Sequence, residues 1–111
     1  MAESLARASF DPIRSLAAGS ISGTYASVGT PTTKRVRGIC FTNTTQGDMM
    51  FTDDITEDKV LVPAGSFKLW DIQANMNAQK DDAYVIQIGT QWSVKQIEAP
   101  VDGSVYIEMI S

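Results

Sequence analysis

Short runs of alternating apolar and polar residues occupy most of this chain. Tyr84, Ile86 and Ile88 share one parity in the second half of the chain, and residues 105–110 alternate in the same way. A side-chain period of two is that of a β-strand, whose successive residues point to opposite faces. No segment shows ten residues of helical periodicity, so the pattern predicts strands and no long helix.

Turn-forming residues separate these runs at intervals of about 8–12 residues. The clearest turns are at residues 44–47, 63–65 and 99–103, the last of which contains an Asp-Gly pair. The runs between the turns predict strands at residues 35–43, 48–52, 60–62, 67–72, 84–88, 91–98 and 105–110. Short strands at this spacing indicate an all-β protein, built as an antiparallel β-sandwich or barrel.

The packing of two sheets buries one face of each strand, and the apolar parity predicts which side chains are inside. The alternation breaks at Gly38, where a β-bulge would bring Val36, Ile39 and Phe41 onto one face. We expect the core to contain Phe41, Phe51, Leu61, Leu69, Ile86, Ile88, Val94, Val105 and Ile107.

Residues 1–33 differ from the rest because they are rich in Ala, Ser, Gly and Thr. We interpret them as an extended N-terminal arm with short strands near residues 12–17 and 24–28, followed by a β-sandwich domain at residues 34–111. Such an arm is either a loose terminus or a segment that orders against a neighbouring subunit. The sparse but regularly placed apolar residues favour ordering, and the small residues favour looseness.

The composition excludes several classes of function. The 111 residues are enough for one domain, and they carry nine basic and thirteen acidic side chains, a net charge of -4. An acidic protein is a poor ligand for nucleic acid or for an anionic membrane. The absence of histidine removes Ser-His-Asp and Cys-His catalysis and histidine-ligated zinc. No apolar stretch approaches a membrane span or a signal peptide, so we expect synthesis in a cytoplasm.

No group of residues predicts a catalytic, cofactor or metal site. Cys40 lies in an apolar run, which favours a buried thiol over a reactive one. The acidic loop at residues 53–58 could bind a cation, but it lacks the alternating acids and central glycine of an EF-hand loop, so a solvated loop is favoured. We therefore expect a protein that is not an enzyme.

Two other features are candidates for binding a partner. The basic run at residues 34–37 is either a solvated strand face or a docking site, since Arg pairs well with carboxylates. The apolar residues out of phase with the expected core would form a second apolar face of a sheet. Such a face either binds a partner or is covered by another part of the same domain. They include Met49, Met50, Trp70, Tyr106 and Ile110. Trp70 or Trp92 could alternatively stack on a carbohydrate.

The last two-thirds of the chain resembles small virion proteins of tailed phages. The similar runs are LVPAGSFKLWDI at residues 61–72, IQIGTQW at residues 86–92 and GSVYIEMIS at residues 103–111. In size and layout the chain resembles the capsid decoration (staple or cement) protein of short-tailed phages of the epsilon fifteen type. That resemblance implies a jelly-roll-like β-sandwich on the outer capsid surface, where it clamps neighbouring major capsid subunits.

The resemblance also implies the major capsid protein as the partner. We further expect a symmetric homodimer and, because of the acidic charge, no binding to nucleic acid or to a membrane. No functional residues transfer from the family. From the residues themselves we predict subunit contacts at Phe10, Ile13, Leu16, Arg35, Arg37, Met49 and Met50. The alternatives are a low-copy phage tail or head-completion protein and a carbohydrate-binding module.

Overall fold

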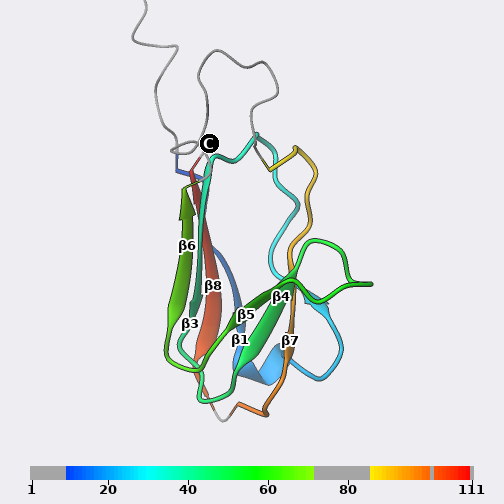
Figure 1. Ribbon diagram of the computed structural model, residues 1–111, viewed down its shortest axis with the longest axis vertical. Helices are drawn as coiled ribbons and strands as arrows, with labels where there is room; N and C mark the ends of the chain where they lie inside the picture. The colour runs from blue at the N-terminus through cyan, green and yellow to red at the C-terminus, as the bar shows by residue number, and fades with distance from the viewer. Residues whose placement is uncertain (1–9, 72–85, 101, 111) are drawn as a thin grey trace, which may run out of the picture.

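The structure is a computed structural model that describes residues 10–71, 86–100 and 102–110. In this part of the chain, eight strands form two four-stranded antiparallel sheets, in the orders β1-β8-β3-β6 and β2-β7-β4-β5 (Figure 1). A short 3-10 turn, Ala18–Ser20, follows the first strand. The strands are β1 (Arg14–Ala17), β2 (Ala26–Ser27), β3 (Gly38–Asn43), β4 (Met49–Thr52), β5 (Val60–Val62), β6 (Phe67–Asp71), β7 (Ser93–Gln96) and β8 (Ser104–Ile110).

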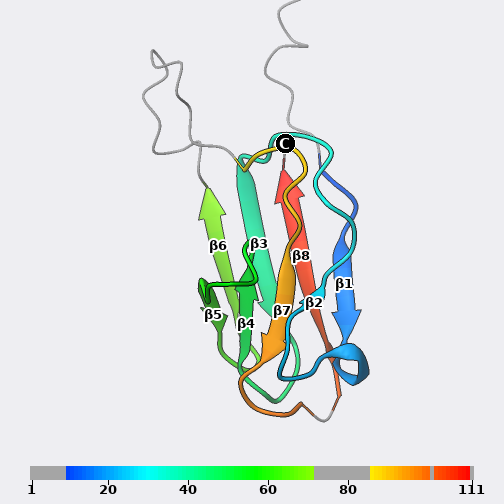
Figure 2. The ribbon, with the colours of Figure 1, turned by 90° about the vertical axis from the view of Figure 1, so that its right-hand side faces the viewer.

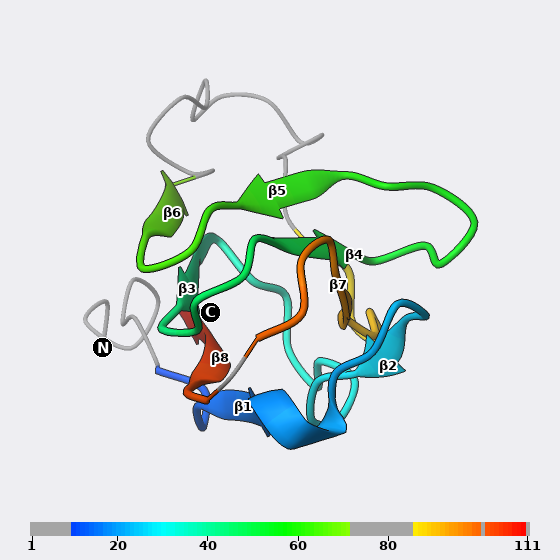
Figure 3. The same ribbon diagram turned by 90° about the horizontal axis from the view of Figure 1, so that it is seen from below.

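The two sheets lie face to face and enclose one core (Figures 2 and 3). The first four strands pair with the last four in reverse order: β1 with β8, β2 with β7, β3 with β6 and β4 with β5. The chain therefore folds as one long hairpin that is rolled into two layers. The prediction of an all-β antiparallel sandwich is confirmed.

Both strands of the N-terminal region belong to these sheets. β1 pairs with β8 and β2 pairs with β7. Ile21, between β1 and β2, and Val28, directly after β2, are buried in the core. The short strands expected near residues 12–17 and 24–28 thus form where they were predicted. Residues 14–17 and 26–27 are therefore strands of the sandwich, and residues 28–37 between β2 and β3 belong to no strand. The start of the predicted arm, residues 1–9, lies outside the described residues.

Segments beyond the ends of β2 and β7 continue to run side by side. Val36 and Ile86 exchange two backbone hydrogen bonds of 3.0 and 2.9 Å. Nearer to the sheet, the buried Thr32 bonds through its backbone and its hydroxyl to residues 87–90. Of the expected strand at 84–88, residues 84 and 85 lie outside the described part, Ile86 forms this bridge, and residues 87 and 88 belong to no strand.

The core prediction is correct for residues of β3, β4, β7 and β8. Phe41, Phe51, Val94, Val105 and Ile107 are each at most 1% exposed, and Ile86 packs against them at the margin. The rings of Phe51 and Trp92 both have their centroids 4.9 Å from that of Phe41, which therefore joins the two sheets. Val36, Ile39 and Phe41 are all buried, as the break at Gly38 predicted.

Three of the expected core residues are instead exposed: Leu61 by 39%, Leu69 by 65% and Ile88 by 60%. In β6 the phase is the reverse of the prediction. Trp70 pairs with the buried Ile39 and its ring meets the edge of Phe41, while Leu69 pairs with Cys40 on the outer face. Apolar residues occupy both sets of alternate positions in this strand. Only its register against β3 therefore decides which set faces the core.

Two buried polar side chains hold the connections in place. Asn43 donates to the carbonyls of Gly47 and Val62 at 2.8 and 3.0 Å and accepts from Thr45, so it joins the end of β3 to β5. Arg14, only 8% exposed, donates to the carbonyl of Thr30 at 2.8 Å. An inward arginine is tolerated there because its guanidinium meets backbone carbonyls.

Candidate protein-binding face

The outer surface of the β1-β8-β3-β6 sheet is the candidate site. Paired residues of neighbouring strands share a face, so the register places the outward side chains in rows. One row contains Phe10, Ile110 and Gly38; the next contains Glu108, Cys40 and Leu69; and the third contains Ser15, Tyr106, Thr42 and Phe67. We call these residues the outer apolar face.

Large apolar side chains on this face are open to solvent. Phe10 is 79% exposed, and Phe67 and Leu69 are each 65% exposed. Tyr106, Ile110 and Cys40 between them are half-buried. A row of exposed aromatic and aliphatic groups on a sheet favours contact with another protein.

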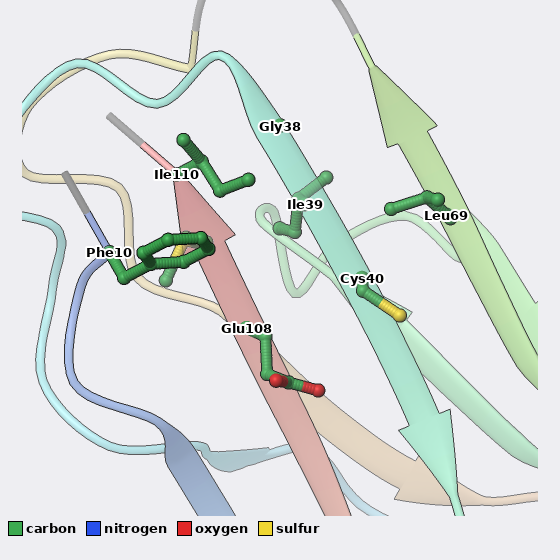
Figure 4. Close-up of a pocket in the computed structure, with 8 residues that line it drawn as sticks. Phe10, Gly38, Ile39, Cys40, Leu69, Glu108 and Ile110 are labelled. Carbon is green, nitrogen blue, oxygen red and sulfur yellow. The ribbon is translucent and has the colours of Figure 1, made fainter. Parts of the chain in front are cut away.

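A hollow opens on this face over Gly38, where a strand position has no side chain. Phe10 and Ile110 stand on one side of it, Leu69 on the other, and Cys40 and Glu108 below (Figure 4). Its volume is about 270 Å³. Pockets for small ligands usually measure about 300–1,000 Å³, so this hollow is sized for one or two side chains of a docking segment.

Glu108 is the only acidic side chain that lines this hollow, as far as the described residues show. It is exposed, and it forms no ion pair or hydrogen bond with the described residues. Its neighbours across the sheet are apolar or weakly polar, since Cys40 lies opposite on β3. The outer apolar face therefore has one carboxylate, that of Glu108, beside the hollow and among apolar or weakly polar neighbours.

The opposite outer surface, on the β2-β7-β4-β5 sheet, has polar links of its own. Asp58 accepts a 2.6 Å hydrogen bond from the Tyr25 hydroxyl and lies 2.9 Å from the Lys95 ammonium. Lys95 also lies 4.9 Å from the centre of the Tyr25 ring. The hydroxyl of Tyr25, and then Lys95, lower the pKa of the Asp58 carboxyl, while burial and the bond to Asp58 raise the pKa of Tyr25.

The carboxylates of the acidic loop are engaged with separate protein groups. Asp53 pairs with Lys59 at 2.8 Å, and Asp54 accepts hydrogen bonds from the backbone and hydroxyl of Thr56. The Thr56 donors lower the pKa of Asp54, and Asp53 raises the pKa of Lys59. Among the described residues, no three acidic or cysteine side chains gather in a way that would hold a metal ion.

The predicted contact residues lie at different depths. Phe10 and Ile13 are exposed, by 79% and 62%, and only Phe10 belongs to the rows of the outer apolar face. Leu16 is half-buried and packs against the core. Arg35 is exposed and Arg37 is half-buried, both just before β3.

Met49 and Met50 differ from each other. Met49 is completely buried between the sheets, so its side chain is unavailable to another subunit in this fold. Met50 is half-buried and pairs with Lys95 and Leu61 on the outer side of the second sheet. Of the two tryptophans, Trp92 is only 7% exposed, which leaves Trp70, at 42%, as the one that reaches the surface for stacking.

Of the residues that line the hollow, Phe10 was among the predicted contacts and the others were not. The sequence pattern predicted a bulge at Gly38 and a core position for Leu69, and it made no prediction for Glu108. A signal was nevertheless present, because Tyr106 and Ile110 were out of phase with the core and do lie on the outer apolar face. Applying the same parity across the paired strands would have found Glu108 between them.

Comparison with protein-family models, with curated proteins and with solved structures finds no match to this chain. Within the described residues, no helix is both long and apolar enough to cross a membrane.

Proposed function

We propose that this protein is a non-catalytic virion component that binds the outside of a phage capsid and clamps neighbouring major capsid subunits. The contact is made through the outer apolar face. The observation that carries the proposal is the set of exposed Phe10, Phe67 and Leu69 side chains on the outer apolar face, of which Phe10 and Leu69 line the hollow over Gly38. The exposure of such an apolar patch to water is unfavourable in free energy, and association with another protein surface removes that exposure.

The strand order also supports this proposal. Eight strands in two four-stranded sheets, nested as β1-β8-β3-β6 and β2-β7-β4-β5, fit a jelly roll, an architecture common in viral capsid proteins and lectins. A fold alone does not determine a function, so the proposal depends mainly on the outer apolar face and on the resemblance to decoration proteins. A lattice of identical sites would strengthen modest individual contacts through avidity.

The test is to locate the protein in virions from the host in which its gene is expressed. Gold-labelled antibodies should mark the outer shell, and quantitative gels should give on the order of hundreds of copies per particle, as a lattice-wide contact requires. About a dozen copies or fewer would instead support the tail or head-completion alternative. Absence from purified virions would refute the proposal.

A paired variant connects that result to the face. Phe67→Thr together with Leu69→Thr keeps β-forming residues in β6 but removes two exposed apolar side chains. We expect this double variant to fold normally and to lose most of its occupancy on shells. Ile97→Thr, another exposed apolar position outside the face, is the control and should bind like the wild type.

A further inference from the structure

The hollow over Gly38 determines what kind of segment can dock there. This inference rests on the proposed function only in taking the outer apolar face as a protein contact. The hollow accepts one large apolar side chain, because its walls are Phe10, Ile110 and Leu69 and its floor is the backbone at Gly38. The same position offers little to a polar side chain, which would lose its water without gaining a partner.

The charge of the docking segment follows from Glu108. This carboxylate lines the hollow and has no cationic partner among the described residues. A neutral or acidic segment would cover it and leave it without compensation, at a cost in desolvation. A basic side chain would pair with it, and arginine is suited to this because its planar group can donate two parallel bonds to one carboxylate.

We propose that the hollow over Gly38 binds a protein segment in which a large apolar residue stands next to an arginine or lysine. The apolar side chain fills the hollow, and the cation pairs with Glu108. The partner is thus defined by complementary charge and shape, and a capsid subunit that this protein clamps should carry such a segment at the seam.

Gly38 makes the hollow testable without damage to the core. It has no positive φ, and a Cβ placed on it would have its nearest neighbours, the Trp70 carbonyl oxygen and Ile110 side-chain carbons, at 3.7 to 3.9 Å, which is ordinary contact distance. Gly38→Val therefore fills the hollow with a residue that suits a strand. The matched control is Gly19→Val, since a Cβ at Gly19 meets nothing within 4 Å.

The experiment selects random linear peptides displayed on a surface against the immobilised full-length protein. We expect the wild type and Gly19→Val to enrich peptides with an aromatic or aliphatic residue beside Arg or Lys. Gly38→Val should not enrich them and should bind the selected peptides about tenfold or more weakly. Glu108→Arg should reverse the charge and enrich peptides with Asp or Glu beside the apolar residue.

Each contrary result overturns the proposal. Failure to enrich any peptide, equal binding by Gly38→Val, or basic peptides selected by Glu108→Arg would each exclude this occupant. Sedimentation velocity measures the oligomeric state of the wild type and of Gly38→Val. If the wild type is a dimer and Gly38→Val is a monomer, the hollow binds a second copy of this chain instead. Thermal unfolding of each variant checks that the fold is intact, and methyl shifts of Ile110 and Leu69 on peptide addition locate the binding.

The result of this experiment can be distinguished from the result that tests the proposed function. Peptide selection could succeed in a protein that is absent from virions, which would keep the docking chemistry and refute the capsid role. Conversely, a virion protein whose Gly38→Val variant still occupies shells fully and still binds the selected peptides would retain the capsid role and lose the hollow.

Discussion

The outer surface of the β2-β7-β4-β5 sheet carries ion-paired side chains, whereas on that of the β1-β8-β3-β6 sheet the charged side chain of Glu108 has no ion pair with the described residues. On the former, Tyr25, Asp58 and Lys95 bond to one another. On the latter, Phe10 and Leu69 stand in solvent and Glu108 has no cation beside it among the described residues. Both sheets share one core, so the difference arises at the surface, and the proposed binding face rests on it.

The largest effect on stability should come from the core that both faces share. Phe41→Ala removes the ring that contacts Phe51, Trp70 and Trp92. We expect a loss of about 3–5 kcal/mol in the free energy of unfolding, measured in urea. A loss below about 1 kcal/mol would show that the two sheets are not joined through this ring.

Asn43→Ala should have the next largest effect. The substitution removes the side-chain donor to the buried Val62 carbonyl and the acceptor of the buried Thr45 amide, while the Gly47 carbonyl keeps its bond from the Thr45 hydroxyl. We expect a loss of about 1–3 kcal/mol in the same assay, since an unsatisfied buried polar group costs about that much. Thr44→Ala, an exposed neighbour in the same turn, should be milder, and an equal loss would count against the role of Asn43.

Tyr25→Phe tests the polar links of the second sheet and should have a smaller effect that depends on pH. The folded state lowers the pKa of Asp58, so its contribution to stability is present above the usual aspartate pKa of about 4 and is lost as the pH falls through the lower folded value. The variant should therefore be slightly less stable than the wild type at neutral pH. The difference should shrink in acid, as thermal unfolding across pH would show, and a constant difference would contradict this assignment.

Phe67→Thr with Leu69→Thr should have the smallest effect on stability. Both side chains are 65% exposed and little is lost from the core, so we expect a change within about 0.5 kcal/mol. If this double variant were clearly less stable than Tyr25→Phe, the outer apolar face would serve folding instead of binding, and the comparison between the two faces would fail.

The sequence predicted the architecture better than the site. In β3 and β8 the inward parity, which contains Phe41 and Ile107, was predicted correctly. β6 has apolar residues at both parities, so Trp70 and Leu69 were assigned in reverse, because the register with β3 depends on residues far away in the chain. Arg14 was not predicted to be buried, since the Thr30 carbonyl that compensates it comes from a distant loop. Whether the face binds a capsid stays a prediction.

The bridge between Phe10 and Ile110 brings the beginning and the end of the folded chain together at one edge of the sandwich. An affinity tag or reporter fused directly before Phe10 or directly after Ile110 would consequently start beside the hollow and could obstruct it. A circular permutant of residues 10–110 avoids this: a short linker would join residue 110 to residue 10, and new ends would open in the loop between β4 and β5, on the other sheet. Immobilised through those ends, the protein would display its apolar side unobstructed.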